Sequence, residues 1–140
     1  MKRMLMAAFA LLLAVAVAAA AYVYLYGGPR VKCELAAFAE QIAGCTPFEQ
    51  AYYVPMSGGT MKRTVHGPTG ETCRVSFATL GPQTLDCAFD TADLPDLARA
   101  LVAQGEAVDA YGYADLRVST SDPDPLTRLM NSDACRLTGG

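Results

Sequence analysis

The sequence predicts an α+β protein, with an N-terminal transmembrane helix followed by a small antiparallel sheet of about four strands that two helices cover. Three patterns lead to this fold class. An uncharged apolar run occupies residues 4–26, four short segments between residues 50 and 89 alternate apolar with polar residues, and apolar residues recur at helical spacing on either side of those segments. We therefore divide the 140 residues into a signal anchor (1–26), a linker (27–32), a disulfide-stapled α+β exported domain (33–105) and a C-terminal extension (106–140).

The apolar run at the N-terminus predicts a membrane anchor. Lys2 and Arg3 precede it, and the stretch from Met4 to Tyr26 is enough helix, at about 1.5 Å per residue, to cross a hydrocarbon core of roughly 30 Å. The positive flank predicts that the N-terminus stays in the cytoplasm. We therefore expect a single-pass protein of a bacterial inner membrane, with its C-terminal domain in the periplasm. The alternative is a signal peptide cleaved after Ala18 or Ala20, which would release a secreted or periplasmic domain.

The charge of the chain is split between its two ends. Residues 1–32 carry four basic side chains and no acidic one, so the rest of the chain carries seven basic and 14 acidic side chains, a formal net charge of −7. Such a surface repels the phosphates of nucleic acids. We therefore expect that the protein does not bind nucleic acid. Because of the predicted anchor, we expect its partners to be the membrane and a membrane protein complex.

Helical spacing returns after the Gly-Gly-Pro sequence that ends the apolar run. One apolar stripe runs through residues 31–43 and predicts a helix. The stripe consists of Leu35, Phe38, Ala39 and Ile42. If this helix is continuous, Cys33 and Cys45 lie about 18 Å apart along it. A disulfide needs Cα atoms within about 7 Å, so we expect these two cysteines not to bond to each other.

Four segments that alternate apolar with polar residues then predict the strands of the sheet. They are Gln50–Met56, Met61–His66, Glu71–Thr79 and Thr84–Phe89. Turns that contain glycine or proline separate them. Pro55 cannot donate a hydrogen bond to a neighbouring strand, so we expect the first segment at an edge of the sheet.

A cross-strand disulfide is predicted between the third and fourth segments. Pairing Val75 with Leu85 keeps both apolar faces on one side of the sheet and sets Cys73 opposite Cys87. Opposed residues of an antiparallel pair have Cα atoms about 4.5–5.5 Å apart, a distance that a disulfide can span. A register shifted by two residues keeps the same faces and stays open as an alternative.

A second amphipathic helix is predicted to follow the sheet. Asp93 can cap its first turn, Pro95 is tolerated there, and Gly105 ends it. The stripe that faces the sheet consists of Leu94, Leu97, Ala98, Leu101 and Val102.

The C-terminal extension is less regular. Residues 106–120 fit a strand with tyrosines on one side or, nearly as well, a helix, and Leu126–Met130 can add one helical turn. Cys135 either bonds to Cys45 or Cys33 or is the odd thiol of the five cysteines. The candidate second disulfide is Cys45 with Cys135.

The chain shows no pattern that carries recognisable catalytic or metal-binding chemistry. It has no Cys-x-x-Cys sequence, and His66 is its only histidine, with no Ser–His–acid arrangement evident around it. We therefore expect no enzyme, no metal and no cofactor. Tyr53, Tyr111 and Tyr113 form a candidate contact surface, because tyrosine is favoured at protein interfaces.

Several short motifs resemble a family of small exported bacterial proteins over about residues 33–104. They are Cys45-Thr46-Pro47, Tyr53-Val54-Pro55, Gly59-Thr60-Met61-Lys62-Arg63 and Gly70-Glu71-Thr72-Cys73, followed by Asp86-Cys87. The resemblance implies the same small fold and no particular activity. Val54-Pro55 stands where the family has His-Pro, and the family's additional cysteine beyond Pro47 is missing here, so the family's disulfide pattern does not transfer.

Two functions follow from these patterns. The favoured one is a non-enzymatic, membrane-anchored accessory or interaction subunit, which exposes a small periplasmic domain to a membrane protein complex. The alternative is an exported module that binds a small ligand or lipid between its helices and its sheet. A pocket there with few aliphatic fillers and a buried polar group would favour the second, and a closed, densely packed core would count against it.

Overall fold

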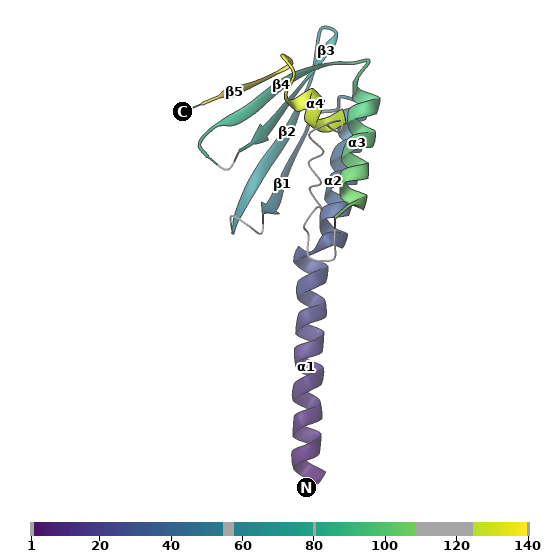
Figure 1. Ribbon diagram of the computed structural model, residues 1–140, viewed down its shortest axis with the longest axis vertical. Coiled ribbons are helices and arrows are strands. Elements are labelled where there is room, and N and C mark those ends of the chain that lie inside the picture. The colour runs from purple at the N-terminus through teal and green to yellow at the C-terminus, as the bar shows by residue number, and fades with distance from the viewer. Residues whose placement is uncertain (1, 55–57, 80, 109–124, 140) are drawn as a thin grey trace.

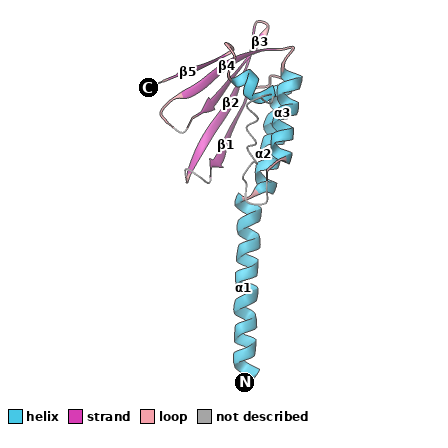
Figure 2. Cartoon of the chain, in the orientation of Figure 1, coloured by secondary structure: helices cyan, strands magenta, loops and turns pink. Residues whose placement is uncertain are grey.

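The computed structural model describes residues 2–54, 58–79, 81–108 and 125–139, and these residues form an α+β fold, as predicted. In them a long apolar helix leads into a two-layered domain, in which helices cover one face of a five-stranded antiparallel sheet (Figure 1; Figure 2). The elements in chain order are α1 (Lys2–Tyr26), α2 (Gly28–Ala43), β1 (Phe48–Val54), β2 (Gly59–Thr69), β3 (Thr72–Ala78), β4 (Thr84–Asp90), α3 (Leu94–Glu106), α4 (Pro125–Met130) and β5 (Cys135–Thr138).

Helix α1 is long and apolar enough to cross a membrane, judged by its length and composition. Its side chains between residues 6 and 25 are nearly all exposed, because no described part of the domain packs against them (Figure 1). A helix with this composition buries its surface in lipid or is removed as a signal sequence.

The predicted linker over residues 27–32 is wrong for all but its first residue. Only Gly27 leaves the helical conformation, and α2 already begins at Gly28. Pro29 lies in the first turn of α2, where its missing N–H needs no partner. The side chain of Arg30 donates to the carbonyl oxygen of Leu25 across the break, at 2.9 Å. The domain therefore follows α1 with no extended spacer (Figure 1).

The sheet is a meander in which each strand pairs with the next along the chain, in the order β1-β2-β3-β4-β5. Alternation along the strands turns apolar side chains toward the helices and polar ones toward solvent. The core between the layers comprises Leu35, Phe38, Ala39, Ile42, Val65, Val75, Phe89, Leu94, Leu97 and Leu101, together with disulfide cysteines. The fifth strand, β5, was not among the predicted strands, because four residues carry too little alternation to be recognised.

Strands β3 and β4 pair two residues away from the predicted register, so the predicted disulfide between Cys73 and Cys87 is wrong. Val75 stands opposite Cys87, and Cys73 stands opposite Phe89. Both cysteines still face the helix layer, because a shift of two residues preserves the faces of a strand. The alternative register that the sequence left open is therefore the one the molecule adopts.

The turn between β3 and β4 explains this register. In the predicted pairing, Pro82 would stand opposite Ala78 inside the ladder, where it has no N–H to donate. In the structure Ala78 pairs with Thr84, which leaves Pro82 in the connecting turn. The backbone N–H of Thr79 closes that turn on the carbonyl oxygen of Gln83, at 3.2 Å.

Cys73 bonds instead to Cys45, and their Cα atoms lie 5.7 Å apart. Cys45 follows α2 with a φ of 46°, in the left-handed region that often ends a helix. The N–H groups of Cys45 and Thr46 both donate to carbonyl oxygens in the last turn of α2, each at 2.9 Å. This cap reverses the chain at the end of α2, and the disulfide ties it to the inner face of the sheet.

Cys87 bonds to Cys135, its direct partner on β5, so the candidate second disulfide between Cys45 and Cys135 is also wrong. The sequence did not reveal this pair, because the two cysteines are 48 positions apart and meet only if the extension returns as a strand. Cys33 is a free, exposed thiol on α2. The prediction that Cys33 and Cys45 do not bond to each other is confirmed.

Helices α2 and α3 pack side by side and antiparallel above the sheet (Figure 1). Gly105 lies at their contact, where a Cβ would be 3.4 Å from both the Cβ of Leu35 and the Cα of Lys32. At the surface, Lys32 pairs with Glu106 at 2.6 Å. Asp93 precedes α3 without a side-chain hydrogen bond to it, so the predicted cap is wrong.

The predicted helical turn at Leu126–Met130 is confirmed as α4, which packs against α3. Most of the ambiguous segment over residues 106–120, with Tyr111 and Tyr113 of the candidate contact surface, lies outside the described residues.

Candidate functional site

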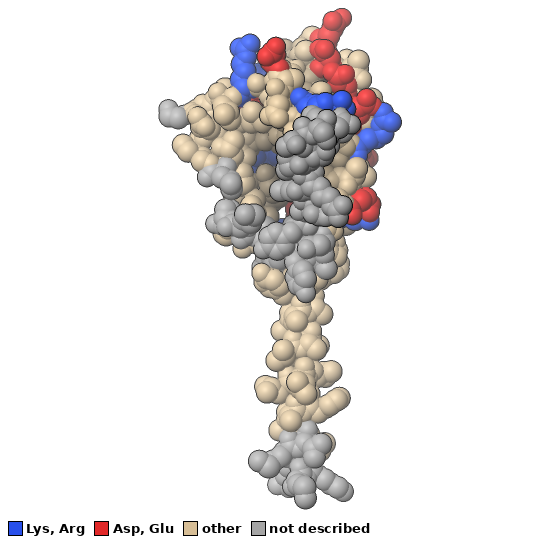
Figure 3. All heavy atoms as spheres, in the orientation of Figure 1, with Lys and Arg blue, Asp and Glu red and all other residues tan. Residues whose placement is uncertain are grey.

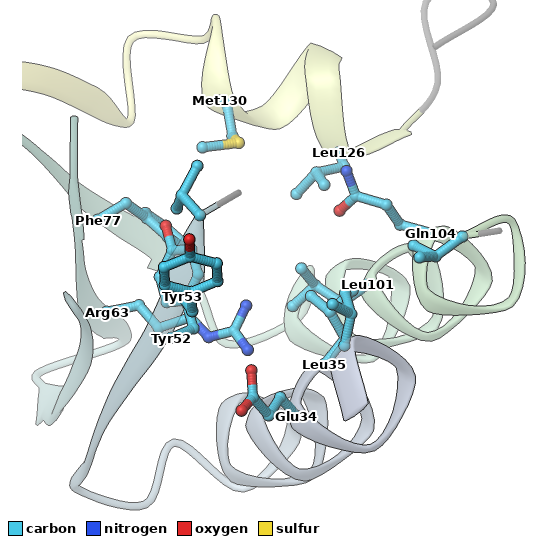
Figure 4. Close-up of a pocket in the computed structure, with 13 residues that line it drawn as sticks. Glu34, Leu35, Tyr52, Tyr53, Arg63, Phe77, Leu101, Gln104, Leu126 and Met130 are labelled. Atoms are coloured by element: carbon cyan, nitrogen blue, oxygen red, sulfur yellow. The ribbon is translucent and has the colours of Figure 1, made fainter. Parts of the chain in front are cut away.

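A cavity of about 340 Å³ lies between the helix layer and the sheet (Figure 4). Its apolar lining comes from both layers and consists of Val31, Leu35, Val54, Phe77, Leu101, Val108, Leu126 and Met130. The polar side chains that line it are Glu34, Tyr52, Tyr53, Arg63 and Gln104. The volume lies at the lower end of the roughly 300–1,000 Å³ that is typical of small-molecule sites, and the mostly apolar lining with a few polar groups is typical too.

Arg63 is a buried charged residue on the wall of this cavity, with only 7% of its surface exposed. It faces the helix layer because it alternates along β2 with side chains that face solvent. Its Nε donates to the Oε1 of Gln50, its direct partner on β1, at 2.7 Å. Its guanidinium carbon lies 4.7 Å from the ring centres of both Phe38 and Tyr52, so two aromatic rings hold the cation.

These contacts leave the two terminal nitrogens of Arg63 without a hydrogen bond to any described residue. No nitrogen or oxygen of a described side chain is fully buried without a partner, so the terminal nitrogens keep access to the cavity. Figure 4 shows the guanidinium group pointing into the cavity, toward Glu34. Burial lowers the pKa of Arg63, and Tyr52 and Glu34 oppose that shift. An arginine pKa starts above about 12, so the side chain stays charged at neutral pH.

No other polar group of the lining forms an ion pair with that charge among the described residues. Glu34 is paired with Arg30, whose Nε lies 2.6 Å from its Oε1, and no ion pair joins Glu34 to Arg63 in the described part of the chain. Burial raises the pKa of Tyr52, against the effect of the Arg63 charge, so the phenol is neutral at pH 7. Of the two charged residues that line the cavity, Glu34 is therefore paired with a residue outside the lining, and Arg63 has no ion pair among the described residues.

A second polar cluster lies on the opposite face of the sheet, where β2, β3 and β4 bring His66, Ser76 and Asp86 together. The Ser76 hydroxyl donates to the Oδ1 of Asp86 at 2.6 Å, and its oxygen lies 2.5 Å from the Nε2 of His66. Thr138 on β5 donates to the other carboxylate oxygen of Asp86. These bonds lower the pKa of Asp86, the Ser76 bond most and the Thr138 bond next.

This cluster contains the residue types of a serine hydrolase, but in a different arrangement. In such enzymes the histidine accepts the serine proton and the acid binds the far ring nitrogen. Here the one hydroxyl proton of Ser76 goes to the Asp86 carboxylate, so His66 Nε2 can only donate to the serine oxygen. His66 therefore cannot act as the base for Ser76 in this arrangement.

The structure brings only part of the predicted site together. Tyr53 lines the cavity, whereas Tyr111 and Tyr113 lie outside the described residues. Cys73 and Cys87 are both bonded in the core, to other partners than predicted.

Sequence reasoning missed Arg63 and the cluster around His66. The signal for Arg63 was its place between Met61 and Val65 on the apolar face of a predicted strand, where a charged residue is out of place. For the cluster there was no comparable signal, because the partners of His66 follow from strand register.

Comparison with protein-family models, curated proteins and solved structures gave no match to this chain. The resemblance described from the sequence therefore stays a prediction, and the function has to be argued from the site.

Proposed function

We propose that this protein is a membrane-anchored, non-enzymatic binding module that holds a small, mostly apolar ligand between its helix layer and its sheet. The cavity of about 340 Å³ carries this proposal, because it is an apolar space beside core side chains that are almost completely buried. The apolar side chains that line this cavity are accessible to water, and covering them with an apolar ligand is favourable.

The size of the cavity limits the ligand. With about 30 Å³ for each water-sized group, about 340 Å³ holds roughly eleven such groups. A ligand of about that many non-hydrogen atoms fills it. The apolar α1 and the two disulfides are what we would expect of a module that acts outside the cytoplasm, at a membrane.

Binding of 1-octanol tests the proposal, because this neutral alcohol has about the required size. The full chain is placed in phosphatidylcholine nanodiscs, and labelled octanol is followed by equilibrium dialysis, with empty discs subtracted. We expect saturable binding to the wild type. If the wild type shows no saturable binding of octanol, the proposed function is overturned.

Two tryptophan substitutions on α3 provide the matched control. Gln104 lines the cavity and is half-buried, so Gln104→Trp should fill the cavity and abolish octanol binding. Ala103 is the exposed neighbour on the same helix, so Ala103→Trp should bind octanol like the wild type. If the two variants bind octanol equally well, the octanol binds outside this cavity.

An accessory subunit of a membrane protein complex is the second candidate. The observation that favours it is the exposed apolar surface, which among the described residues lies almost wholly on α1. In the domain itself only Val102 and Leu137 are large, apolar and exposed among those residues, so a partner would bind chiefly within the membrane. Co-purification of one partner in fixed proportion, lost when polar residues replace apolar ones in α1, would favour this candidate.

A further inference from the structure

We propose that the ligand is a single-chain carboxylate of the fatty-acid class, whose carboxylate pairs with Arg63 while its chain lies along the apolar wall of the cavity. This inference rests on the proposed function and adds the chemical class of the ligand. Three features of the described residues carry it: the bonding of Arg63, the charge around the cavity and the position of part of the cavity wall next to α1.

The bonding of Arg63 calls for an anion. A guanidinium group presents its N–H donors in one plane and can hold both oxygens of a carboxylate at once. Gln50 takes only the Nε, so the two terminal nitrogens remain available at the cavity wall (Figure 4). The rings of Phe38 and Tyr52 fix the plane of the group in advance. A buried charge without an ionic partner is costly, and an anion in the cavity removes that cost.

The charge around the cavity selects a single negative charge. Glu34 and Arg63 are the charged residues of the lining, and the Glu34 carboxylate is paired with Arg30 outside it, so Arg63 carries the positive charge without an ion pair among the described residues. A carboxylate ligand supplies the one negative charge that pairs with it. A phosphate monoester, with nearly two negative charges at pH 7, would leave an excess negative charge beside Glu34. The monoanion is therefore favoured.

Part of the cavity wall lies on the first turns of α2, next to α1, while α4 lines the cavity farther from α1 (Figure 1). Val31 and Glu34 on α2 stand about 8 and 12 Å beyond the end of α1 at Tyr26, at about 1.5 Å per residue. The last turn of α3 lies beside the start of α2, as the Lys32–Glu106 pair shows. If α1 spans a membrane, the part of the cavity wall on α2 stands near the lipid headgroups. An acyl chain that leaves the bilayer meets it there.

The acidic surface points to the same source. The chain beyond residue 32 has a formal net charge of −7, which repels anions that approach through water. Most acidic side chains in view in Figure 3 gather at the end of the domain away from α1. An anion reaches the cavity with least repulsion along α1, from the membrane side.

The test compares octanoate with 1-octanol, which share a chain and differ in the carboxylate. The full chain in phosphatidylcholine nanodiscs is dialysed against each labelled compound at pH 7, with empty discs subtracted. We expect the wild type to bind octanoate at least about tenfold more tightly than octanol, as charged hydrogen bonds contribute. Octanol binding with no preference for octanoate would overturn this inference and leave the proposed function standing, whereas absence of binding by both would overturn both.

Two substitutions at Arg63 sharpen the result. Arg63→Met keeps an unbranched stem that reaches the position of Nε and removes the charge, so the ratio of octanoate affinity to octanol affinity should fall to about one. Arg63→Lys keeps the charge without the planar pair of donors, so its preference should be intermediate. A preference that survives in Arg63→Met would show that another group binds the carboxylate, and would overturn the assignment.

The source of the carboxylate is a separate arm of the same experiment. Decanoate, which has about the size that the cavity holds, is mixed into the disc lipid beforehand, and in parallel octanoate is displaced by unlabelled octanoate added in water. Displacement by the lipid-borne decanoate supports entry from the bilayer. Displacement only by the water-borne compound supports pairing with Arg63 but overturns entry from the membrane.

Discussion

On the outer face of the sheet, polar side chains of neighbouring strands form hydrogen bonds with each other. On the inner face, Arg63 is buried among aromatic rings, and its terminal nitrogens have no hydrogen-bond acceptor among the described residues. Asp86 accepts from both Ser76 and Thr138, and Ser76 also contacts His66. Arg63 has a single hydrogen-bond partner among the described residues, Gln50. The outer cluster is exposed to water, so its bonds add little to stability, while the inner charge is held where unpaired charge is expensive.

This difference between the two faces indicates which polar group belongs to a binding site. A cluster whose donors and acceptors satisfy one another needs nothing from outside, even when its residue types are those of an enzyme. A buried cation whose free donors border a cavity needs a partner, and the described part of the chain does not supply one. The composition of a cluster is thus a weaker guide to a site than the accounting of its hydrogen bonds.

The largest expected effect of a substitution falls on the inner face. Phe38 is fully buried, packs against Phe48 and Phe77 and forms one side of the Arg63 sandwich. Phe38→Ala should lower the free energy of unfolding by about 3–5 kcal/mol, through lost burial and the space it leaves. Thr64→Ala, next to Arg63 on the outer face, should change it by less than about 0.5 kcal/mol.

Hydrogen exchange of the slowest backbone amides, with the full chain in nanodiscs, measures both changes. Similar losses for the Phe38 and Thr64 variants would break the distinction between the two faces.

A smaller effect is expected from the disulfide that ties α2 to the inner face. Replacing both Cys45 and Cys73 by alanine should lower the free energy of unfolding by about 3 kcal/mol, because the bond closes a loop of 28 residues. The same amide exchange experiment measures it. The Cys33→Ala variant is the control, since that thiol is exposed and unbonded, and it should leave stability unchanged. If the double variant matched the control, the bond would contribute nothing to the stability of the inner face.

The sequence predicted the elements of the fold well and the contacts between them poorly. Period-two and helical patterns identified α2, the first four strands and α3, since those patterns record which side of each element is buried. The disulfides failed because a register shifted by two residues leaves the same pattern, and only the position of Pro82 in the turn separates the two. The pair of Cys87 with Cys135 depends on a strand of four residues.

The candidate site was predictable only in outline. A ligand-binding space between helices and sheet was one of two functions inferred from the pattern, with a buried polar group as its mark. Arg63 stood on the apolar face of its strand, but its partners Gln50 and Phe38 come from other elements, and no local pattern shows that they meet. The cavity itself depends on how α3 and α4 pack, which short-range patterns do not encode.

The smallest effect is expected on the outer face, and it depends on pH. Hydrogen bonds from Ser76 and Thr138 lower the pKa of Asp86 in the folded protein. A carboxyl group with a lowered folded pKa stabilises the fold at pH values above its unfolded pKa of about 3.9, and that contribution is lost as the pH falls through the folded pKa. Asp86→Asn keeps the shape and removes the charge. The wild type should therefore melt higher than this variant at about pH 6, and the difference should shrink below about pH 4.

Melting of the two full chains in nanodiscs, followed by circular dichroism from neutral to acidic pH, gives this difference directly. Asp86 is partly exposed, so we expect the contribution to stay below about 1 kcal/mol. A difference that grew on acidification would mean that the folded pKa of Asp86 is raised. The outer cluster would then hold a strained carboxyl group, and the contrast with the unpaired cation of the inner face would fail.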